Sequence, residues 1–259
     1  MQPDARRRTL AVVGALAALL AACGTQGDTA GPDAPDELVV FAAASLTEAF
    51  EALGTAFAAT DGGVPVVLNL AGSQTLAAQL VEGAPADVFA AADAVRMAVV
   101  AEAGLLAAPA EPFATNRLAI VVEPGNPRGV TGPSDLGRED LVVVLPAEEV
   151  PAGRYARQLL AAVGVAVAPA SLEPDVRAAV AKVALGEADA TIAYASDVAS
   201  AGGRVDGVAI PDDVDVTATY PIAVLADAPA GVDVAARFVA FVRSEAGGAI
   251  LAAHGFGAP

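Results

Sequence analysis

The sequence predicts an α/β fold in which a parallel or mixed sheet is covered by helices on both faces. Two observations predict this class. From Glu37 onward, short apolar runs typical of buried strands alternate with segments whose apolar residues recur at helical spacing. Hydrophobic residues make up 55% of the 259 residues, which is ample for such a core. The length suits one large domain or two domains of roughly 100 to 150 residues each.

The predicted elements alternate along the chain. Residues 38–42 are apolar throughout and predict a strand, and residues 47–58 carry apolar side chains every three or four positions and predict a helix. The later predicted strands are 64–70, 88–91, 118–122, 141–145, 190–194, 208–210 and 222–226. The later predicted helices are 75–81, 95–103, 152–163, 174–185 and 234–252.

Residues 1–22 have the composition of an export signal. Three arginines precede an apolar run that is shorter than the stretch of about 20 residues that a membrane-spanning helix needs. The run ends in Leu-Ala-Ala-Cys followed by Gly24, which resembles a bacterial lipoprotein signal and implies that Cys23 is lipidated. Residues 23–36 are then expected to form a flexible tether, since they are rich in glycine, proline and aspartate. The alternative is that Cys23 is an ordinary buried cysteine.

Charge and residue counts exclude several functions. The chain has 14 basic and 31 acidic side chains, a formal net charge of −17, so nucleic acid is a poor partner for it. One cysteine and one histidine cannot form an intramolecular disulfide or a Cys/His zinc site. The sequence also lacks a nucleophile elbow, a phosphate-binding loop and a dinucleotide-binding glycine pattern. An enzyme would have to work with unpaired carboxylates, and we expect no enzyme, no catalytic residue and no resident cofactor.

The spacing of two predicted strands indicates a division into two lobes. About a hundred residues with strands and helices of their own separate 118–122 from 222–226. If both strands cross between lobes, lobe 1 contains residues 37–115 and 221–259, and lobe 2 contains residues 116–220. A single wide sheet is the alternative that the pattern leaves open.

Four predicted helix starts are candidate anion-binding points, at Ser45, Ser73, Pro151 and Pro174. In open α/β sheets, ligands collect beside helix amino termini at the carboxyl ends of strands, where backbone N–H groups lack partners. Each start also has a purely structural explanation. Ser45 and Glu48 have the spacing of a capping box, Ser73 suits a helix N-cap, and the two prolines suit first helical positions. Convergence of these starts on one cleft is a hypothesis.

Other polar residues have less specific roles. Arg154 and Arg177 are expected on solvated or ion-paired helix faces more often than in direct contact with an anion. The Tyr194 hydroxyl either donates to a ligand or points from the core to solvent. The acidic cluster 212–215 lacks the glycine and distal glutamate of a calcium loop, and so predicts a solvated turn.

Four segments together resemble the molybdate-binding proteins of bacterial ABC transporters. They are VFAAASLT at 40–47, GAPADVF at 83–89, VPAGRYA at 150–156 and AYASD at 193–197. The resemblance implies a two-lobed fold of the periplasmic-binding-protein type II class. In that fold each lobe is a mixed sheet flanked by helices, and the ligand cleft lies between the lobes.

The resemblance also implies a set of ligand-binding residues. Ser45 and Ser73 would bind the oxyanion through hydroxyl and backbone N–H, Ala152 and Val176 through backbone N–H, and Tyr194 through its hydroxyl. Molybdenum would thus be held as its oxyanion. We refer to these residues below as the site residues.

The resemblance implies a lipoprotein that captures molybdate, and also tungstate, and delivers it to a membrane permease and its ATPase. We expect a monomer, anchored through Cys23 on the extracytoplasmic side of the cell membrane. The alternatives are the same fold with sulfate, phosphate or a small organic anion as ligand, a hydrolase that uses clustered carboxylates, and a surface adhesion domain.

Overall fold

The computed structural model describes residues 37–60 and 63–259. The predicted export signal (1–22), the lipidation of Cys23 and the tether (23–36) lie outside the described residues. Within the residues described, no helix combines the length and the hydropathy that a membrane crossing requires.

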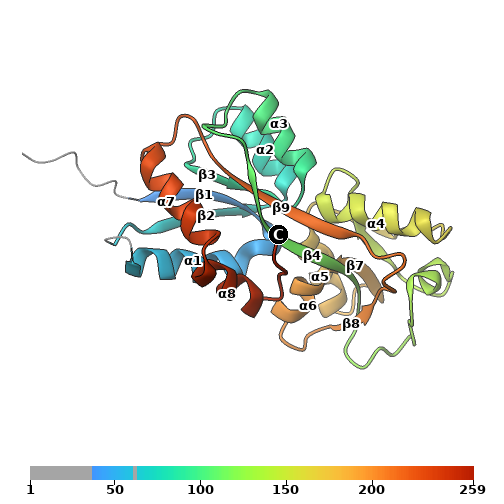
Figure 1. The fold of residues 1–259 in the computed structure, drawn as a ribbon. Coiled ribbons are helices and arrows are strands. Elements are labelled where there is room, and N and C mark those ends of the chain that lie inside the picture. The colour runs from blue at the N-terminus through green and yellow to red at the C-terminus, as the bar shows by residue number, and fades with distance from the viewer. Residues whose placement is uncertain (1–36, 61–62) are drawn as a thin grey trace, which may run out of the picture. The chain divides into compact units, whose positions relative to one another are not determined.

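A mixed sheet of seven strands forms the centre of the fold (Figure 1). The strands are β1 (Leu38–Ala43), β2 (Val66–Ala71), β3 (Val88–Ala90), β4 (Glu111–Val122), β7 (Ala190–Tyr194), β8 (Asp206–Ala209) and β9 (Thr217–Val224). Their order is β2-β1-β3-β9-β4-β7, with β8 also paired to β4. Strands β1, β2 and β3 are parallel, and β9 runs antiparallel to both β3 and β4. The mixed sheet confirms the predicted α/β class.

A short parallel pair extends the sheet beyond β7. This pair consists of β5 (Val144–Pro146) and β6 (Ser171–Glu173), and a parallel bridge between Val143 and Ala190 connects it to β7. Strand β6 was missed in the sequence, because three residues are too few to show a pattern.

Helices cover both faces of the sheet (Figure 1). They are α1 (Thr47–Thr60), α2 (Ser73–Val81), α3 (Ala94–Glu102), α4 (Pro151–Ala162), α5 (Val176–Ala184), α6 (Ala195–Ser200), α7 (Val232–Val242) and α8 (Glu245–Ala253). Strand β1 is buried between two apolar clusters, since alternate side chains of a strand point to opposite faces. Val40 packs in the cluster of Phe50 on α1, whereas Phe41 packs with Leu76 of α2 and Met97 of α3.

Strand β4 changes partners at its midpoint. Residues 111–117 pair with β9, and residues 118–122 pair with β7 and β8. The strand is therefore longer than the predicted 118–122, and β9 begins and ends earlier than the predicted 222–226. Both predicted lobe boundaries, near 116 and 220, fall inside this pair of adjacent strands.

The predicted helix 234–252 is wrong, because the structure has two helices there. α7 ends at Val242, and Ser244 caps α8 by accepting a hydrogen bond from the Gly247 N–H at 3.2 Å. A Cβ at position 247 would lie 2.3 Å from the carbonyl oxygen of Phe241, so glycine permits this close turn. The short helix α6 was not predicted either.

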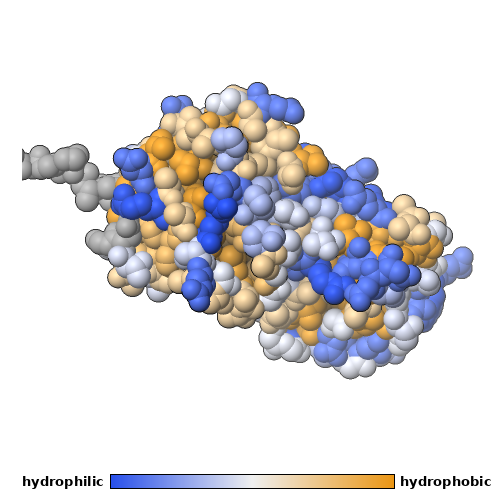
Figure 2. All heavy atoms as spheres, viewed as in Figure 1, coloured by the Kyte–Doolittle hydropathy of each residue, from blue (hydrophilic) through white to orange (hydrophobic). Residues whose placement is uncertain are grey.

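Exposed apolar side chains come from several elements. The most exposed are Leu185, at 73%, and Leu172, at 53%. On the face shown in Figure 2, hydrophilic residues are interspersed with hydrophobic ones. This spread does not single out one face as a docking surface.

Candidate functional site

The predicted helix starts meet at the carboxyl ends of parallel strands. Strand β1 continues into a one-turn 3₁₀ helix, η1 (Ala44–Leu46), and β2 into α2. Strands β5 and β6 run parallel to each other, and they precede α4 and α5 respectively. Because parallel strands place their carboxyl ends at one edge, each lobe proposed from the sequence contributes two such starts.

All the site residues line one small cavity. The site residues that line it are each at most 5% exposed: Ser45, Ser73, Ala152, Val176 and Tyr194. The remaining lining residues are Ala43, Ala44, Gly72, Ala92, Val150, Pro151 and Asp175. The structure thus brings these residues together at one small, largely filled pocket.

The two serines do not have the capping roles that their spacing allows. Ser45 lies inside η1, and its Oγ is 3.0 Å from the Tyr220 hydroxyl, so the capping box with Glu48 is not formed. Ser73 is the first residue of α2 rather than its N-cap, which is Gly72. The Ser73 Oγ accepts a hydrogen bond from the Ala92 N–H at 3.0 Å, which leaves its own hydrogen free to donate.

Tyr194 ends strand β7 with its side chain buried. Its hydroxyl has no hydrogen-bond partner among the described residues, although the side chain is only 1% exposed. Burial raises the pKa of this hydroxyl well above its ordinary value, so the group is a neutral donor. A buried hydroxyl without a partner costs stability, and such groups are rare unless a ligand or a water accepts the hydrogen bond.

The starts of α4 and α5 contribute backbone donors. Pro151 begins α4 as predicted, whereas Pro174 precedes α5, which starts at Val176 after the N-cap Asp175. The prediction for Pro174 is therefore wrong, because the Asp175 side chain caps the helix by accepting from the Ala178 N–H at 2.9 Å. The first N–H groups of a helix have no acceptor within it, so those of Ala152 and Val176 can donate to a ligand.

Glycine at position 153 allows α4 to start so close to β5. A Cβ there would lie 2.0 Å from the carbonyl oxygen of Ala147 and 2.4 Å from that of Pro146. The backbone at the start of α4 is thus seated directly against the chain that leaves β5. This close packing fixes the position of the neighbouring Ala152 N–H.

Two ion pairs flank the cavity and use both candidate arginines. Arg154 Nη2 donates to Asp93 Oδ2 at 2.7 Å, and the Asp93 side chain is fully buried. Arg177 Nη1 donates to Glu48 Oε2, also at 2.7 Å. Burial raises the pKa of Glu48, but the hydrogen bond and charge of Arg177 outweigh burial and leave this pKa below its ordinary value. The ion-paired role expected for the arginines is confirmed.

Each ion pair joins segments that are distant in sequence and adjacent to site residues. Arg177 directly follows Val176, and Glu48 lies in the first turn after Ser45. A further contact of this kind is the hydrogen bond from Gln74 Nε2 to the Pro174 carbonyl oxygen at 2.7 Å. These contacts hold the helix starts together around the cavity.

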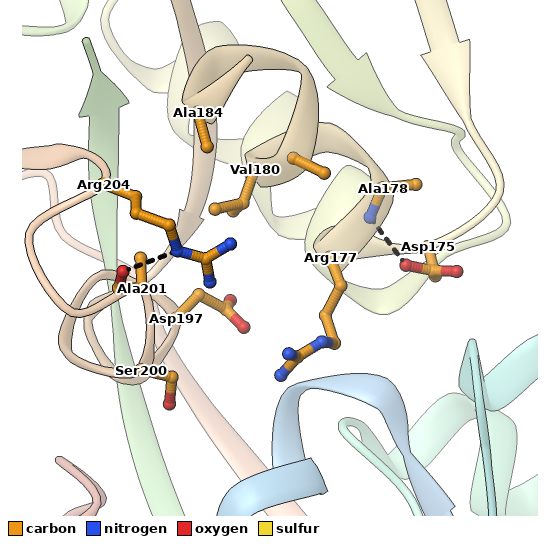
Figure 3. A pocket seen from close by; sticks show the side chains of 10 residues that line it. Asp175, Arg177, Ala178, Val180, Ala184, Asp197, Ser200, Ala201 and Arg204 are labelled. Carbon is orange, nitrogen blue, oxygen red and sulfur yellow. Dashed lines mark hydrogen bonds between the residues drawn. The ribbon is translucent and has the colours of Figure 1, made fainter.

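A larger pocket lies next to this cavity, between α5 and α6 (Figure 3). It has about 800 Å³ of space open to solvent, and Arg177, Asp197 and Arg204 point into it. Burial raises the pKa of Asp197 to about 7, although the hydrogen bond from the Tyr194 N–H and the charge of Arg177 lower it. Asp197 Oδ2 accepts that N–H at 3.0 Å and thereby fixes the backbone of Tyr194.

The acidic cluster 212–215 lies away from the cavity, at the surface. Residues 212–214 form a turn, and the Asp212 side chain is 89% exposed, so the predicted solvated turn is confirmed there. Asp215 is the exception, because its side chain is buried, and both Asp212 and Asp215 form ion pairs with Arg117. Within the described residues, no group of three or more histidine, cysteine, aspartate and glutamate side chains is arranged to hold a metal ion.

The sequence did not reveal the supporting residues of the site. Tyr220, Ala92 and Asp93 each contact a site residue or its neighbour, but their partners lie between 19 and 175 positions away. No local spacing rule connects residues so far apart. The proximity of Asp93 to the GAPADVF segment was the only available signal.

Comparisons with known proteins give a matching family and similar proteins. Residues 38–257 match the family model described as bacterial extracellular solute-binding protein. The molybdate-binding protein ModA of Mycobacterium bovis is 42% identical over 250 residues, which cover 94% of this chain and 95% of that protein.

Solved structures are similar in fold. The periplasmic molybdate-binding protein of Azotobacter vinelandii has a TM-score of 0.74 at 21% identity, over 86% of this chain and all of that one, 100%. The sulfate-binding protein SubI of Mycobacterium tuberculosis also has a TM-score of 0.74 at 21% identity, over 85% of this chain and 86% of that one. The fold alone therefore does not distinguish between the two anions.

Proposed function

Because the chain belongs to the bacterial extracellular solute-binding proteins, we propose that it captures molybdate outside the cytoplasmic membrane for uptake by an ABC transporter. The family gives the protein a role in transport and an extracytoplasmic location. The identity of 42% to a molybdate-binding protein over nearly the whole chain supports molybdate over other oxyanions.

One observation supports the proposal most strongly. Serine hydroxyls, helix-start N–H groups and the unpartnered Tyr194 hydroxyl surround the same small cavity. All of these groups donate hydrogen bonds, which is what a fully deprotonated tetrahedral oxyanion requires. We propose that Ser45, Ser73, Ala152 and Val176, together with Tyr194, bind the anion through these donors.

Neutral donors suit a dianion in this acidic protein. Arg154 and Arg177 are paired with carboxylates, so their charges are largely compensated near the cavity. Each helix amino terminus contributes about 0.3 to 1 kcal/mol, or up to about 2 kcal/mol when it is partly buried. Fixed donors also select among oxyanions by size. An oxyanion whose central atom forms shorter bonds to oxygen is smaller, and it leaves some of the buried N–H groups unpaired.

The division into lobes belongs to the same proposal. Residues 37–115 and 221–259 would form lobe 1 and residues 116–220 lobe 2, with β4 and β9 as the crossing strands. Periplasmic binding proteins are known to close around their ligands by a hinge motion between two domains. Ser45 and Ser73 then belong to lobe 1, and the remaining site residues to lobe 2.

Delivery and anchoring complete the proposed role. The loaded protein would pass its anion to a membrane permease driven by an ATPase, and it would act as a monomer tethered through a lipid on Cys23. Tungstate, which carries the same charge on a tetrahedral oxyanion, would be captured as well.

Calorimetry on the purified protein, freed of bound anion, tests this function. We expect molybdate and tungstate to bind, and sulfate and phosphate to give little heat. Sulfate binding equal to or tighter than molybdate binding would refute the assignment. Small-angle scattering with and without molybdate tests closure, for which we expect a smaller radius of gyration in the loaded protein.

A further inference from the structure

Tyr220 touches the candidate anion site without lining it. This residue belongs to β9, where it pairs with Ala114 of β4, and it is fully buried. Its hydroxyl lies 3.0 Å from Ser45 Oγ, within a buried hydrogen bond in which either atom can donate. The ligand serine is therefore connected to a side chain 175 positions away.

Aromatic neighbours fix the position of the Tyr220 ring. Its centroid lies 6.3 Å from that of Phe113, 5.7 Å from that of Tyr194 and 5.5 Å from that of Phe256, in edge-on arrangements. Each such pair contributes about 0.5 to 1.5 kcal/mol beyond simple burial. The ring cannot swing away, so the hydroxyl stays beside Ser45.

The direction of the hydrogen bond determines what Ser45 presents to the cavity. A serine hydroxyl has a single hydrogen. If Ser45 donates to Tyr220, it turns oxygen lone pairs toward an anion, which repels them. If Tyr220 donates, the Ser45 hydrogen is free to point at the anion. Burial raises the pKa of Tyr220 well above its ordinary value, more than the hydrogen-bonding groups around its hydroxyl, on Ser45, Asn116 and Tyr194, lower it, so Tyr220 keeps its hydrogen.

Ser73 shows the same arrangement with a backbone donor. Its Oγ accepts a hydrogen bond from the Ala92 N–H, and a backbone N–H can act only as a donor. The hydrogen of the Ser73 hydroxyl is therefore free to point into the cavity. Each serine oxygen thus has one protein group within hydrogen-bond distance: the Ala92 N–H for Ser73 and the Tyr220 hydroxyl for Ser45. The difference is that a substitution can remove the donor to Ser45.

We propose that Tyr220 is a positioning residue, which donates to Ser45 Oγ and thereby turns the Ser45 hydrogen toward the bound oxyanion. This inference rests on the proposed function, since it concerns the same site. It adds a residue of β9, one of the two strands that connect the halves of the sheet, to the groups that determine anion affinity.

A double-mutant cycle on the full chain tests the proposal. We expect Tyr220→Phe to weaken molybdate binding about tenfold in calorimetry, because the Ser45 hydrogen is no longer oriented. In the Ser45→Ala background, the same substitution should change affinity by less than about twofold, since the group that it orients is gone. Phenylalanine keeps the ring packing, and thermal unfolding of the ligand-free variants verifies that the fold is retained.

The Ser73→Ala background is the matched control. Tyr220→Phe should weaken binding there by the same factor as in the wild type, because Ser73 is oriented by Ala92. An equal loss in the Ser45→Ala background, or no loss in the wild type, would overturn the proposal. Failure of the proposed function has a separate readout, because the wild-type protein would then prefer sulfate to molybdate. In that case the double-mutant cycle is measured with sulfate, which also needs hydrogen-bond donors.

Discussion

Gly153→Ala tests whether close backbone packing holds the start of α4 in place. The added Cβ would lie 2.0 Å from the Ala147 carbonyl oxygen, whereas real Cβ atoms keep at least 3.0 Å from such neighbours. Main-chain atoms cannot rotate away as the end of a side chain can. Either α4 or the chain that leaves β5 must therefore move by about 1 Å, at a cost typical of overpacked sites.

This shift affects both binding and stability. A displacement of about 1 Å stretches a hydrogen bond of normal length beyond its useful range, so the Ala152 N–H would lose contact with the anion. We expect molybdate affinity to fall about ten- to a hundredfold, as for a lost bond to a charged group. Overpacking should lower the free energy of unfolding by about 1 to 3 kcal/mol, and the better helix propensity of alanine offsets about 0.5 to 1 kcal/mol of that.

Gly248→Ala in α8 is the matched control. A Cβ at position 248 meets no atom within 4 Å. This variant should therefore gain about 0.5 to 1 kcal/mol of stability and bind molybdate like the wild type. Urea unfolding and calorimetry on both variants measure these quantities. If Gly153→Ala bound molybdate with unchanged affinity and unfolded no earlier than the wild type, the packing argument would be refuted.

Three further substitutions probe the surroundings of the cavity. Tyr194→Phe should weaken molybdate binding by about 0.5 to 3 kcal/mol. The stability of the ligand-free protein should stay the same or increase, because the substitution removes an unpaired buried hydroxyl. Unchanged affinity in calorimetry would exclude this hydroxyl as a ligand. Arg154→Met should lower the urea-unfolding free energy by about 2 kcal/mol, because the buried Asp93 carboxylate loses its countercharge and keeps only the hydrogen bond from the Arg96 N–H. An additional Asp93→Asn should recover most of the loss, and no recovery would contradict the pairing. Burial raises the pKa of Asp197 from its ordinary 3.8 to about 7. The native state therefore binds more protons than the unfolded chain, and this residue costs stability as pH rises from about 4 through 7. Asp197→Asn should thus raise the thermal unfolding midpoint above that of the wild type at pH 8 but not at pH 4, and a pH-independent difference would count against the buried charge.

The sequence predicted two buried strands of the sheet almost to the residue. Residues 190–194 form β7 as predicted, and the apolar run 38–42 is β1 with one residue added. Boundaries near helix breaks were less predictable. The apolar periodicity of 234–252 continues through the turn at Ser244, and only the serine itself signals a new helix start.

The sequence predicted helix starts near four of the five candidate site residues, but it did not predict the contacts that support them. Motifs around Ser45 and Val176 are local, so their place at helix starts follows from the chain itself. The partners of Ser45 and of Glu48 depend on tertiary packing, which joined them to Tyr220 and Arg177 rather than to each other. A capping box is a local preference of about 1 kcal/mol, and tertiary contacts outweighed it here.

The exchange of neighbours along β4 has a mechanical consequence. One strand alone would let the two halves of the sheet swivel about its axis in any sense. Here β9 runs hydrogen-bonded beside β4 from Glu111 to Arg117, just before β4 passes to β7 and β8. A ribbon of two hydrogen-bonded strands bends easily out of its plane but resists shear within it. It therefore allows rotation of the two halves about one axis only. The proposed hinge closure would therefore follow a single path, which returns the proposed donors of both lobes to the same places after every cycle.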